Sequence, residues 1–186
     1  MGKIKATIKL VFAAIIIGTC TVSQLSAEQN SLPDLYDDLK AADAETALGL
    51  EREIKRLWEL SGSPSVDFLY EKGNSAFLSG DYTTSIEHYS AAIEFAPEFA
   101  MGWFARARAY TYMNYYGPAL KDIEKALLFD PRHFYAVLSL GQLLEKLDMP
   151  FLAIKAYEEA LEIHPHLTEA KELQDRIDRS VLDKKI

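Results

Sequence analysis

Four histidines are the residues in this sequence that most invite an acid–base or metal-binding role. Two of them, His164 and His166, flank Pro165, and neutral imidazoles are common zinc ligands. A zinc site needs further ligands at matching spacing, and the sequence places none beside this pair. We therefore expect a structural or solvated pair here, and we expect His88 on the outer side of a helix.

Motifs for other kinds of catalysis are missing from the sequence. It contains no glycine-rich phosphate loop, no GxSxG and no HExxH, the short patterns of phosphate binding, serine hydrolysis and zinc proteolysis. Its acidic pairs, such as Asp37-Asp38 and Glu158-Glu159, alternate with basic residues as on a solvated helix face. The sequence predicts a non-enzymatic protein with no cofactor, no metal ion and no small-molecule substrate.

The net charge argues against nucleic acid as a partner. The 186-residue chain has a formal net charge of −8. Its first 27 residues carry three lysines and no acids, so the remaining 17 basic and 28 acidic residues leave −11. A surface this acidic repels phosphate backbones, because nucleic-acid affinity depends on Lys and Arg displacing condensed counterions.

Residues 1–27 have the pattern of a secretory signal peptide. Three lysines precede an apolar stretch from Leu10 to Ile17, and small and polar residues end the segment at Ala27. The apolar stretch is shorter than the roughly 20 apolar residues that span a bilayer. We therefore expect cleavage after Ala27 and export to the periplasm.

Cys20, the only cysteine, leaves a second interpretation of this segment open. Ile17-Gly18-Thr19-Cys20 resembles a bacterial lipobox, in which the cysteine is acylated, although Thr19 stands where Gly, Ala or Ser is usual. A lipoprotein would be tethered to a membrane through Cys20. After cleavage at Ala27, by contrast, the mature chain has neither a thiol nor a disulfide.

A period of 34 residues is the strongest pattern in the chain. The segments AAIEFAP, KALLFDP and EALEIHP end at Pro97, Pro131 and Pro165, which are 34 residues apart. Small and apolar residues recur in the same register, at intervals that follow the turn of a helix. Each unit therefore predicts two helices, with turn-forming residues between them.

This alternation of small and large residues resembles the tetratricopeptide repeat. The resemblance implies an all-α fold, a right-handed superhelical solenoid of antiparallel helix pairs. Its repeats would be 66–99, 100–133 and 134–167, followed by a capping helix and tail at 168–186. Position 7 of the first two repeats departs from the family pattern, because it holds Lys72 and Arg106 in place of an apolar residue.

Residues 28–65, which precede the repeats, predict a pair of helices. The first covers 33–42 and the second 43–60, with Asp43 as a plausible N-cap. The second helix carries apolar residues at helical spacing up to Trp58. We expect this pair to form a degenerate repeat that packs on the first unit.

In this family, the first helices of the pairs line a concave surface that binds extended peptides or helices. Positions 2, 5, 9 and 12 of each unit face that groove. The predicted partner-binding residues are Tyr70, Asn74, Phe77, Met101, Phe104, Arg108, Tyr135, Leu138 and Gln142. Because aromatic side chains and arginine dominate binding energy at interfaces, we expect a protein or peptide partner. The alternative is that the chain itself, its N-terminal helices or a second copy covers the aromatic side chains.

These features predict a protein–protein interaction module or scaffold of the bacterial cell envelope, with an envelope protein as partner. A self-associating protein, whose aromatic face closes a homodimer, is the alternative. Family members that bind chaperone tails hold a C-terminal carboxylate with lysine, asparagine and arginine at five positions. Here those positions hold Tyr70, Asn74, Ala105, Tyr135 and Ser139. Because none of the five is a cation, chaperone-tail binding is not predicted.

Overall fold

The computed structural model describes residues 31–183, in which every regular element is an α-helix. The predicted all-α class is confirmed. The helices are α1 (Leu32–Ala41), α2 (Ala44–Trp58), α3 (Pro64–Leu78), α4 (Tyr82–Phe95), α5 (Ala100–Tyr112), α6 (Tyr116–Phe129), α7 (Phe134–Lys146), α8 (Pro150–Ile163) and α9 (Thr168–Asp183). The predicted signal peptide and Cys20 lie outside the described residues. Within 31–183, no helix has the length and apolar character needed to cross a membrane.

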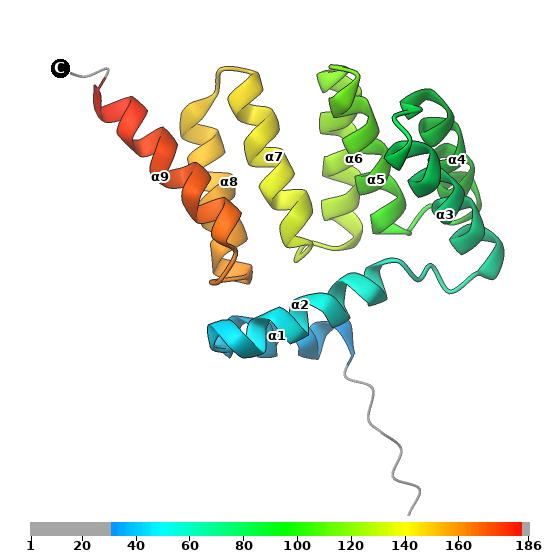
Figure 1. The fold of residues 1–186 in the computed structure, drawn as a ribbon, viewed down its shortest axis with the longest axis horizontal. Coiled ribbons are helices and arrows are strands. Elements are labelled where there is room, and N and C mark those ends of the chain that lie inside the picture. Colours follow the sequence, from blue (N-terminus) through cyan, green and yellow to red (C-terminus); the bar gives the residue numbers. More distant parts are fainter. Residues whose placement is uncertain (1–30, 184–186) are drawn as a thin grey trace, which may run out of the picture.

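Six of these helices form three antiparallel pairs that stack in a row (Figure 1). α3 packs on α4, α5 on α6 and α7 on α8, and each pair contacts the next. α9 packs on α8 at the end of the row, where it covers the last pair. This arrangement is the predicted solenoid of helix pairs with a C-terminal capping helix.

The turn inside each pair has the same backbone conformation. Shortly after the first helix, a residue adopts the left-handed region: Gly80 has φ 83°, Asn114 has φ 61° and Asp148 has φ 58°. Glycine enters this region freely, and Asn and Asp tolerate it better than other side chains. Residues of this kind end helices, so the 34-residue period reverses the chain at the same point of each unit.

Close packing within the pairs depends on small residues on the first helix. A Cβ atom at Gly73 would lie 2.5 Å from the Tyr89 ring, and one at Gly141 would lie 2.4 Å from the Tyr157 ring. Both tyrosines are buried, with 1% and 0% exposure. In the middle pair, the smaller Ile123 occupies the position of the tyrosine. This pair therefore accommodates Ala107 at the position of the glycine, and the two side chains belong to one buried cluster.

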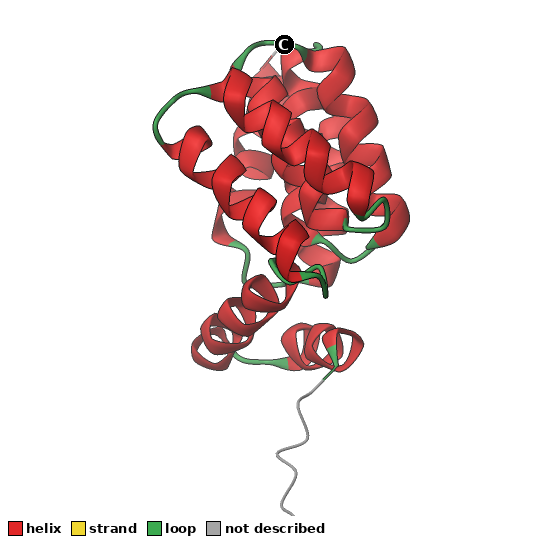
Figure 2. Cartoon of the chain, turned by 90° about the vertical axis from the view of Figure 1, so that its right-hand side faces the viewer, coloured by secondary structure: helices red, strands yellow, loops and turns green. Residues whose placement is uncertain are grey.

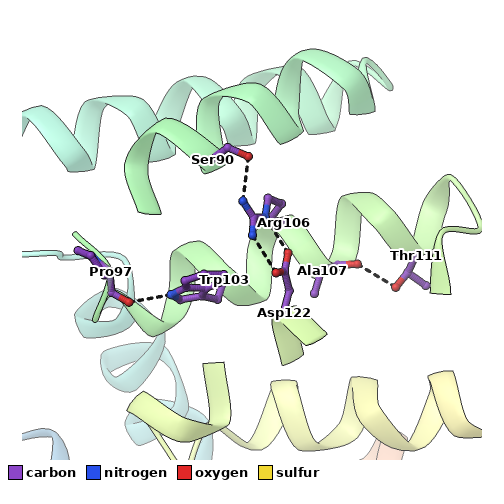
Figure 3. A network of polar contacts seen from close by, with 7 residues as sticks. All are labelled: Ser90, Pro97, Trp103, Arg106, Ala107, Thr111 and Asp122. Atoms are coloured by element: carbon purple, nitrogen blue, oxygen red, sulfur yellow. Dashed lines mark hydrogen bonds and ion pairs between the residues drawn. The ribbon is translucent and has the colours of Figure 1, made fainter. Parts of the chain in front are cut away.

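Arg106, one of the two departures from the apolar pattern, joins three helices through an ion-pair network (Figure 3). Its guanidinium donates to both carboxylate oxygens of Asp122 on α6, at 2.7 and 2.8 Å, and to the Ser90 hydroxyl on α4 at 2.9 Å. Burial disfavours the charged guanidinium, but the hydrogen bonds and charge of Asp122 outweigh burial, so the pKa of Arg106 is raised. Lys72, the other departure, is exposed and lies over the Phe68 ring.

The N-terminal pair, α1 and α2, does not pack on the first repeat, so that prediction is wrong. The pair lies crosswise below the ends of the repeat helices (Figures 1 and 2) and shares a core with the third repeat. Trp58 stacks on His133, with ring centroids 3.8 Å apart, and its indole N–H donates to Asp130 at 2.9 Å. The Tyr36 hydroxyl donates to the same carboxylate at 2.5 Å.

A second set of contacts holds α2 against the end of the third repeat. Glu51 accepts a hydrogen bond from the Tyr135 hydroxyl at 2.7 Å, and its carboxylate lies 3.3 Å from Nε2 of His164. Gly62, with φ 82°, lies in the linker between α2 and α3, where a left-handed residue redirects the chain. The pair therefore docks on the loops at the ends of the repeats and does not continue the stack.

Candidate functional site

The first helices of the three pairs line a groove. A hollow of about 560 Å³ lies between α3, α5 and α7, and α2 with its C-cap adds Lys55, Trp58 and Glu59 to its lining. All nine residues predicted from the repeat register line this hollow: Tyr70, Asn74, Phe77, Met101, Phe104, Arg108, Tyr135, Leu138 and Gln142.

A second hollow, of about 850 Å³, continues the groove between α5, α7 and α9. Phe104, Arg108, Ser139, Gln142 and Glu169 line both hollows, so the two form one concave surface. The capping helix thus covers the last repeat and also forms one wall of the groove.

Three of the nine predicted residues form the floor of the groove. Tyr70, Phe104 and Leu138 are only 4%, 5% and 2% exposed. Tyr70 packs edge-on against Phe99, with ring centroids 5.5 Å apart, and burial raises the pKa of Tyr70. The six predicted residues that stay partly exposed are Asn74, Phe77, Met101, Arg108, Tyr135 and Gln142.

Tyr135 is partly covered by the N-terminal pair. Lys55 on α2 places its Nζ 5.4 Å from the centre of the Tyr135 ring, and the hydroxyl donates to Glu51. Burial, followed by the carboxylate of Glu51, raises the pKa of Tyr135. Phe77, on α3, packs against the rings of Tyr82 and Tyr112, which also belong to the repeats.

Arg108 is the positive charge at the centre of the groove. Its guanidinium carbon lies 4.7 Å from the centre of the Phe77 ring and 5.9 Å from that of Phe104. Within residues 31–183, no side chain or backbone group pairs with this guanidinium through a hydrogen bond or an ion pair.

Two carboxylates next to Arg108 in the lining, those of Glu145 and Glu169, in contrast already have partners. The guanidinium of Arg176 donates to both oxygens of Glu145 at 2.8 Å, and the Tyr157 hydroxyl donates to Glu145 at 2.5 Å. The amide of Gln142 donates to Glu169 at 2.9 Å. Lys55 is paired with Glu51, so Arg108 is the cation lining the central hollow that remains available to a ligand. Glu59 is the carboxylate of that lining without a hydrogen bond or ion pair among the described residues.

Two histidines stabilise the loops between repeats. His133 is fully buried, and its Nδ1 accepts the Ala136 N–H at 3.2 Å, which caps α7. Burial lowers the pKa of His133 to about 3. His164 is buried, whereas His166 is exposed, with Nε2 3.0 Å from the carbonyl oxygen of Ala42. Across the described residues, no group of three or more His, Cys, Asp or Glu side chains could hold a metal ion.

Comparison with known proteins assigns the first two helix pairs to a family. The family model described as Tetratricopeptide repeat matches residues 66–99 and 102–133. The chain contains tetratricopeptide repeats. The helices α7 and α8 form a third pair with the same arrangement, beyond the two matched segments.

Several relatives share these repeats. A TPR repeat-containing protein of Rhizobium etli is 29% identical over 141 residues, which are 75% of this chain and 69% of that protein. Tetratricopeptide repeat protein 12 of Homo sapiens is 34% identical over 60% of this chain, but the match covers only 16% of the human protein. The likeness therefore concerns only a small part of the human protein.

Solved structures of tetratricopeptide repeat domains superpose on somewhat less than two thirds of the chain. The Arabidopsis OM64 TPR domain has a TM-score of 0.60 and 26% identity, with 62% of this chain and 95% of that domain covered. The first TPR of Spaghetti (RPAP3), bound to an HSP90 peptide, has a TM-score of 0.61 and 26% identity, with 63% and 93% covered. These likenesses confirm the predicted tetratricopeptide repeat family.

The repeat register does not predict the groove residues that come from outside the tetratricopeptide repeats. Lys55 and Trp58 on α2 and Glu59, the C-cap of α2, reach the groove from the N-terminal pair, and Glu169 reaches it from α9. The amphipathic pattern that ends at Trp58 indicates burial, but no feature of the pattern identifies the surface on which the helix docks.

Proposed function

We propose that this protein is an interaction module that binds another protein, as an extended peptide or a helix, along its concave groove. The observation that carries this proposal is the gathering of six partly exposed aromatic, apolar, amide and cationic residues on one continuous hollow surface. A concave, largely apolar surface with a few placed polar groups is the usual form of a binding site. Aromatic residues and arginine are the types that most often dominate interface energy.

A peptide ligand is consistent with the complex of a similar domain, in which the first TPR of Spaghetti holds an HSP90 peptide. This chain has no cation at the positions that hold a terminal carboxylate in chaperone-binding repeats. Those positions are occupied by Tyr70, Asn74, Ala105, Tyr135 and Ser139. The proposed ligand is therefore a peptide segment of another protein and not a chaperone tail.

We further propose the bacterial cell envelope as the setting, with an envelope protein as the partner. This part of the proposal is supported by the signal-peptide pattern of residues 1–27. This setting does not depend on the groove. It is therefore tested separately, by whether residues 1–27 are removed and by the cell fraction in which the protein is found.

Site-specific photocrosslinking in living bacteria tests the groove. A photoreactive residue in place of Gln142, which lines both hollows, should capture a partner. The same residue in place of Glu124, exposed on α6, should not. Phe77→Ser should abolish capture from position 142, whereas the matched change Phe95→Ser, at a side chain 73% exposed on α4, should leave it unchanged. Equal capture from both positions would place the binding surface elsewhere.

Self-association is the second candidate function, because apolar side chains stand exposed at the ends of the first helices. Leu78, Tyr112 and Leu147 are 84%, 61% and 36% exposed, and exposed apolar patches commonly mark interfaces. Light scattering gives the mass of the full chain in solution. A monomeric mass across the working concentration range rules out the homodimer, and a dimeric mass with crosslinks between two copies at position 142 supports it.

A further inference from the structure

We propose that the groove selects a segment with an acidic side chain between apolar residues, and that Arg108 binds this carboxylate. The inference rests on the proposed function and names the chemistry of its ligand. It follows from the state of Arg108 in the groove, from the partners of the neighbouring acids and from the apolar surface around them.

The first observation is that Arg108 lacks the carboxylate partner that Arg106 and Arg176 have. Arg106 binds Asp122 and Arg176 binds Glu145, each through two hydrogen bonds of 2.7 to 2.8 Å. Arg108 instead packs its guanidinium on the rings of Phe77 and Phe104 and leaves its N–H groups without a protein acceptor among the described residues. A planar guanidinium in this state matches the two oxygens of a carboxylate.

The second observation concerns the surroundings of this charge. The side chain is only partly exposed and lies at the junction of the two hollows. An ion pair formed away from bulk water is stronger than one on an open surface. Of the acids that line the hollows, Glu145 is held by Arg176 and Tyr157, and Glu169 by Gln142. Glu59 also lines the central hollow but forms no ion pair with Arg108.

The third observation is the apolar surface on either side of Arg108. Phe77 and Met101 are partly exposed and line the same hollow, with Leu138 in its floor. Apolar side chains of a ligand would cover these residues while its carboxylate meets the guanidinium. Arg108 is not one of the five positions that hold a terminal carboxylate in chaperone-binding repeats, so we assign the carboxylate to a side chain and not to a chain terminus.

A peptide display selection tests this assignment with the full chain. The probe is a library of random peptides joined at their C-termini to a phage coat protein, so that every free carboxylate belongs to a side chain. The unaltered protein should enrich peptides with Asp or Glu flanked by apolar residues. Arg108→Glu should enrich peptides with Lys or Arg at that place, and Arg108→Gln should select without a preference for charge.

Arg52→Glu is the matched control, because Arg52 is exposed on α2 and lines neither hollow. This variant should select the same acidic peptides as the unaltered protein. For the leading peptide, Arg108→Gln should weaken binding by about 10- to 100-fold, as when one partner of a desolvated charge pair is lost. A synthetic peptide with its acid changed to the amide should bind the unaltered protein equally weakly, whether its C-terminus is free or amidated.

The possible outcomes separate the two proposals. If the enriched peptides show no preference for acidic residues, or if Arg108→Glu still selects acidic peptides, the role proposed for Arg108 is wrong while the groove remains a binding site. If no peptide is enriched above the level found on a support that carries no protein, the proposal that the groove binds peptides is wrong, and this inference is wrong with it. If binding is lost only when the C-terminus is amidated, the carboxylate is terminal and the assignment is overturned.

Discussion

The ion pair between Arg106 and Asp122 provides the sharpest test of how the repeats are packed. The Asp122 side chain is 6% exposed and the Arg106 side chain 16%. Asp122→Ala would leave the guanidinium largely buried, with the Ser90 hydroxyl as its remaining partner. Removing one member of a buried pair costs about 3 to 5 kcal/mol, and the retained bond to Ser90 places the expected loss near 3 kcal/mol, the lower end of that range.

The third repeat shows how the same place can be filled without charge. One period later, Arg106 and Asp122 are replaced by Leu140 and Ala156, and Ala156 is 5% exposed. The double variant Arg106→Leu/Asp122→Ala copies this apolar pair into the middle repeat. Because apolar replacement of a buried ion pair is often neutral or stabilising, we expect its stability to lie within about 1 kcal/mol of the parent, or above it.

Urea unfolding, monitored by far-ultraviolet circular dichroism, gives the free energy of unfolding of both variants. The slope of each transition shows whether cooperativity has changed. The pair also predicts strong coupling in a double-mutant cycle, because the second substitution removes the charge that the first leaves unpaired. A loss below about 1 kcal/mol for Asp122→Ala would refute the buried ion pair. A double variant as unstable as the single one would refute the explanation by uncompensated charge.

Other predictions address packing, pH and processing. Gly141→Ala should destabilise the protein by about 1 to 3 kcal/mol, because its Cβ would lie 2.4 Å from the Tyr157 ring. Gly49 is an exposed helical site where an added Cβ would meet only the Arg52 side chain, at 4.0 Å, so Gly49→Ala should stabilise the protein by about 0.5 to 1 kcal/mol. Equal free energies of unfolding in urea for the two variants would contradict this account of the packing. Because the pKa of His133 falls from 6.5 to about 3 on folding, the unfolded state binds the extra proton between these values. Stability should therefore drop by about 1.4 kcal/mol per pH unit as the pH falls below about 6.5. His133→Asn, which keeps a side-chain acceptor for the helix cap, should reduce this slope, and an unchanged slope would exclude His133 as its source. In a bacterial host, we expect the periplasmic fraction to contain a chain shortened by residues 1–27, with Cys20→Ser processed normally. A Cys20→Ser variant that stays unprocessed would instead support the lipoprotein alternative.

The helix pairs could be predicted because their determinants are local. Gly80, Asn114 and Asp148 recur at the period of the repeat and end the first helix of each pair, since each tolerates a left-handed backbone. The same period places small residues such as Gly73 and Gly141 opposite large rings. The repeat pattern of the sequence was therefore sufficient to predict which neighbouring helices pair.

Departures from the repeat pattern were less predictable. Lys72 and Arg106 occupy the same position of two units, yet Lys72 is exposed and Arg106 is held in an ion pair. The difference lies in the second helix of each pair, which carries His88 in the first unit and Asp122 in the second at the equivalent position. Whether a charged side chain forms an ion pair depends on which side chain of the packed neighbouring helix lies within reach. The spacing of residues within one helix does not show this.

By itself, the sequence determined the helical class, the 34-residue period and nine of the residues that line the groove, because side-chain direction along a helix follows from local backbone geometry. Only the tertiary structure decided that Tyr70 and Phe104 lie in the floor and that α2 docks beside Tyr135. These outcomes depend on contacts between distant parts of the chain. Trp58 and Asp130 are 72 residues apart, and Glu51 and His164 are 113 residues apart. No local pattern specifies such pairs, because their meeting depends on how all the intervening helices pack.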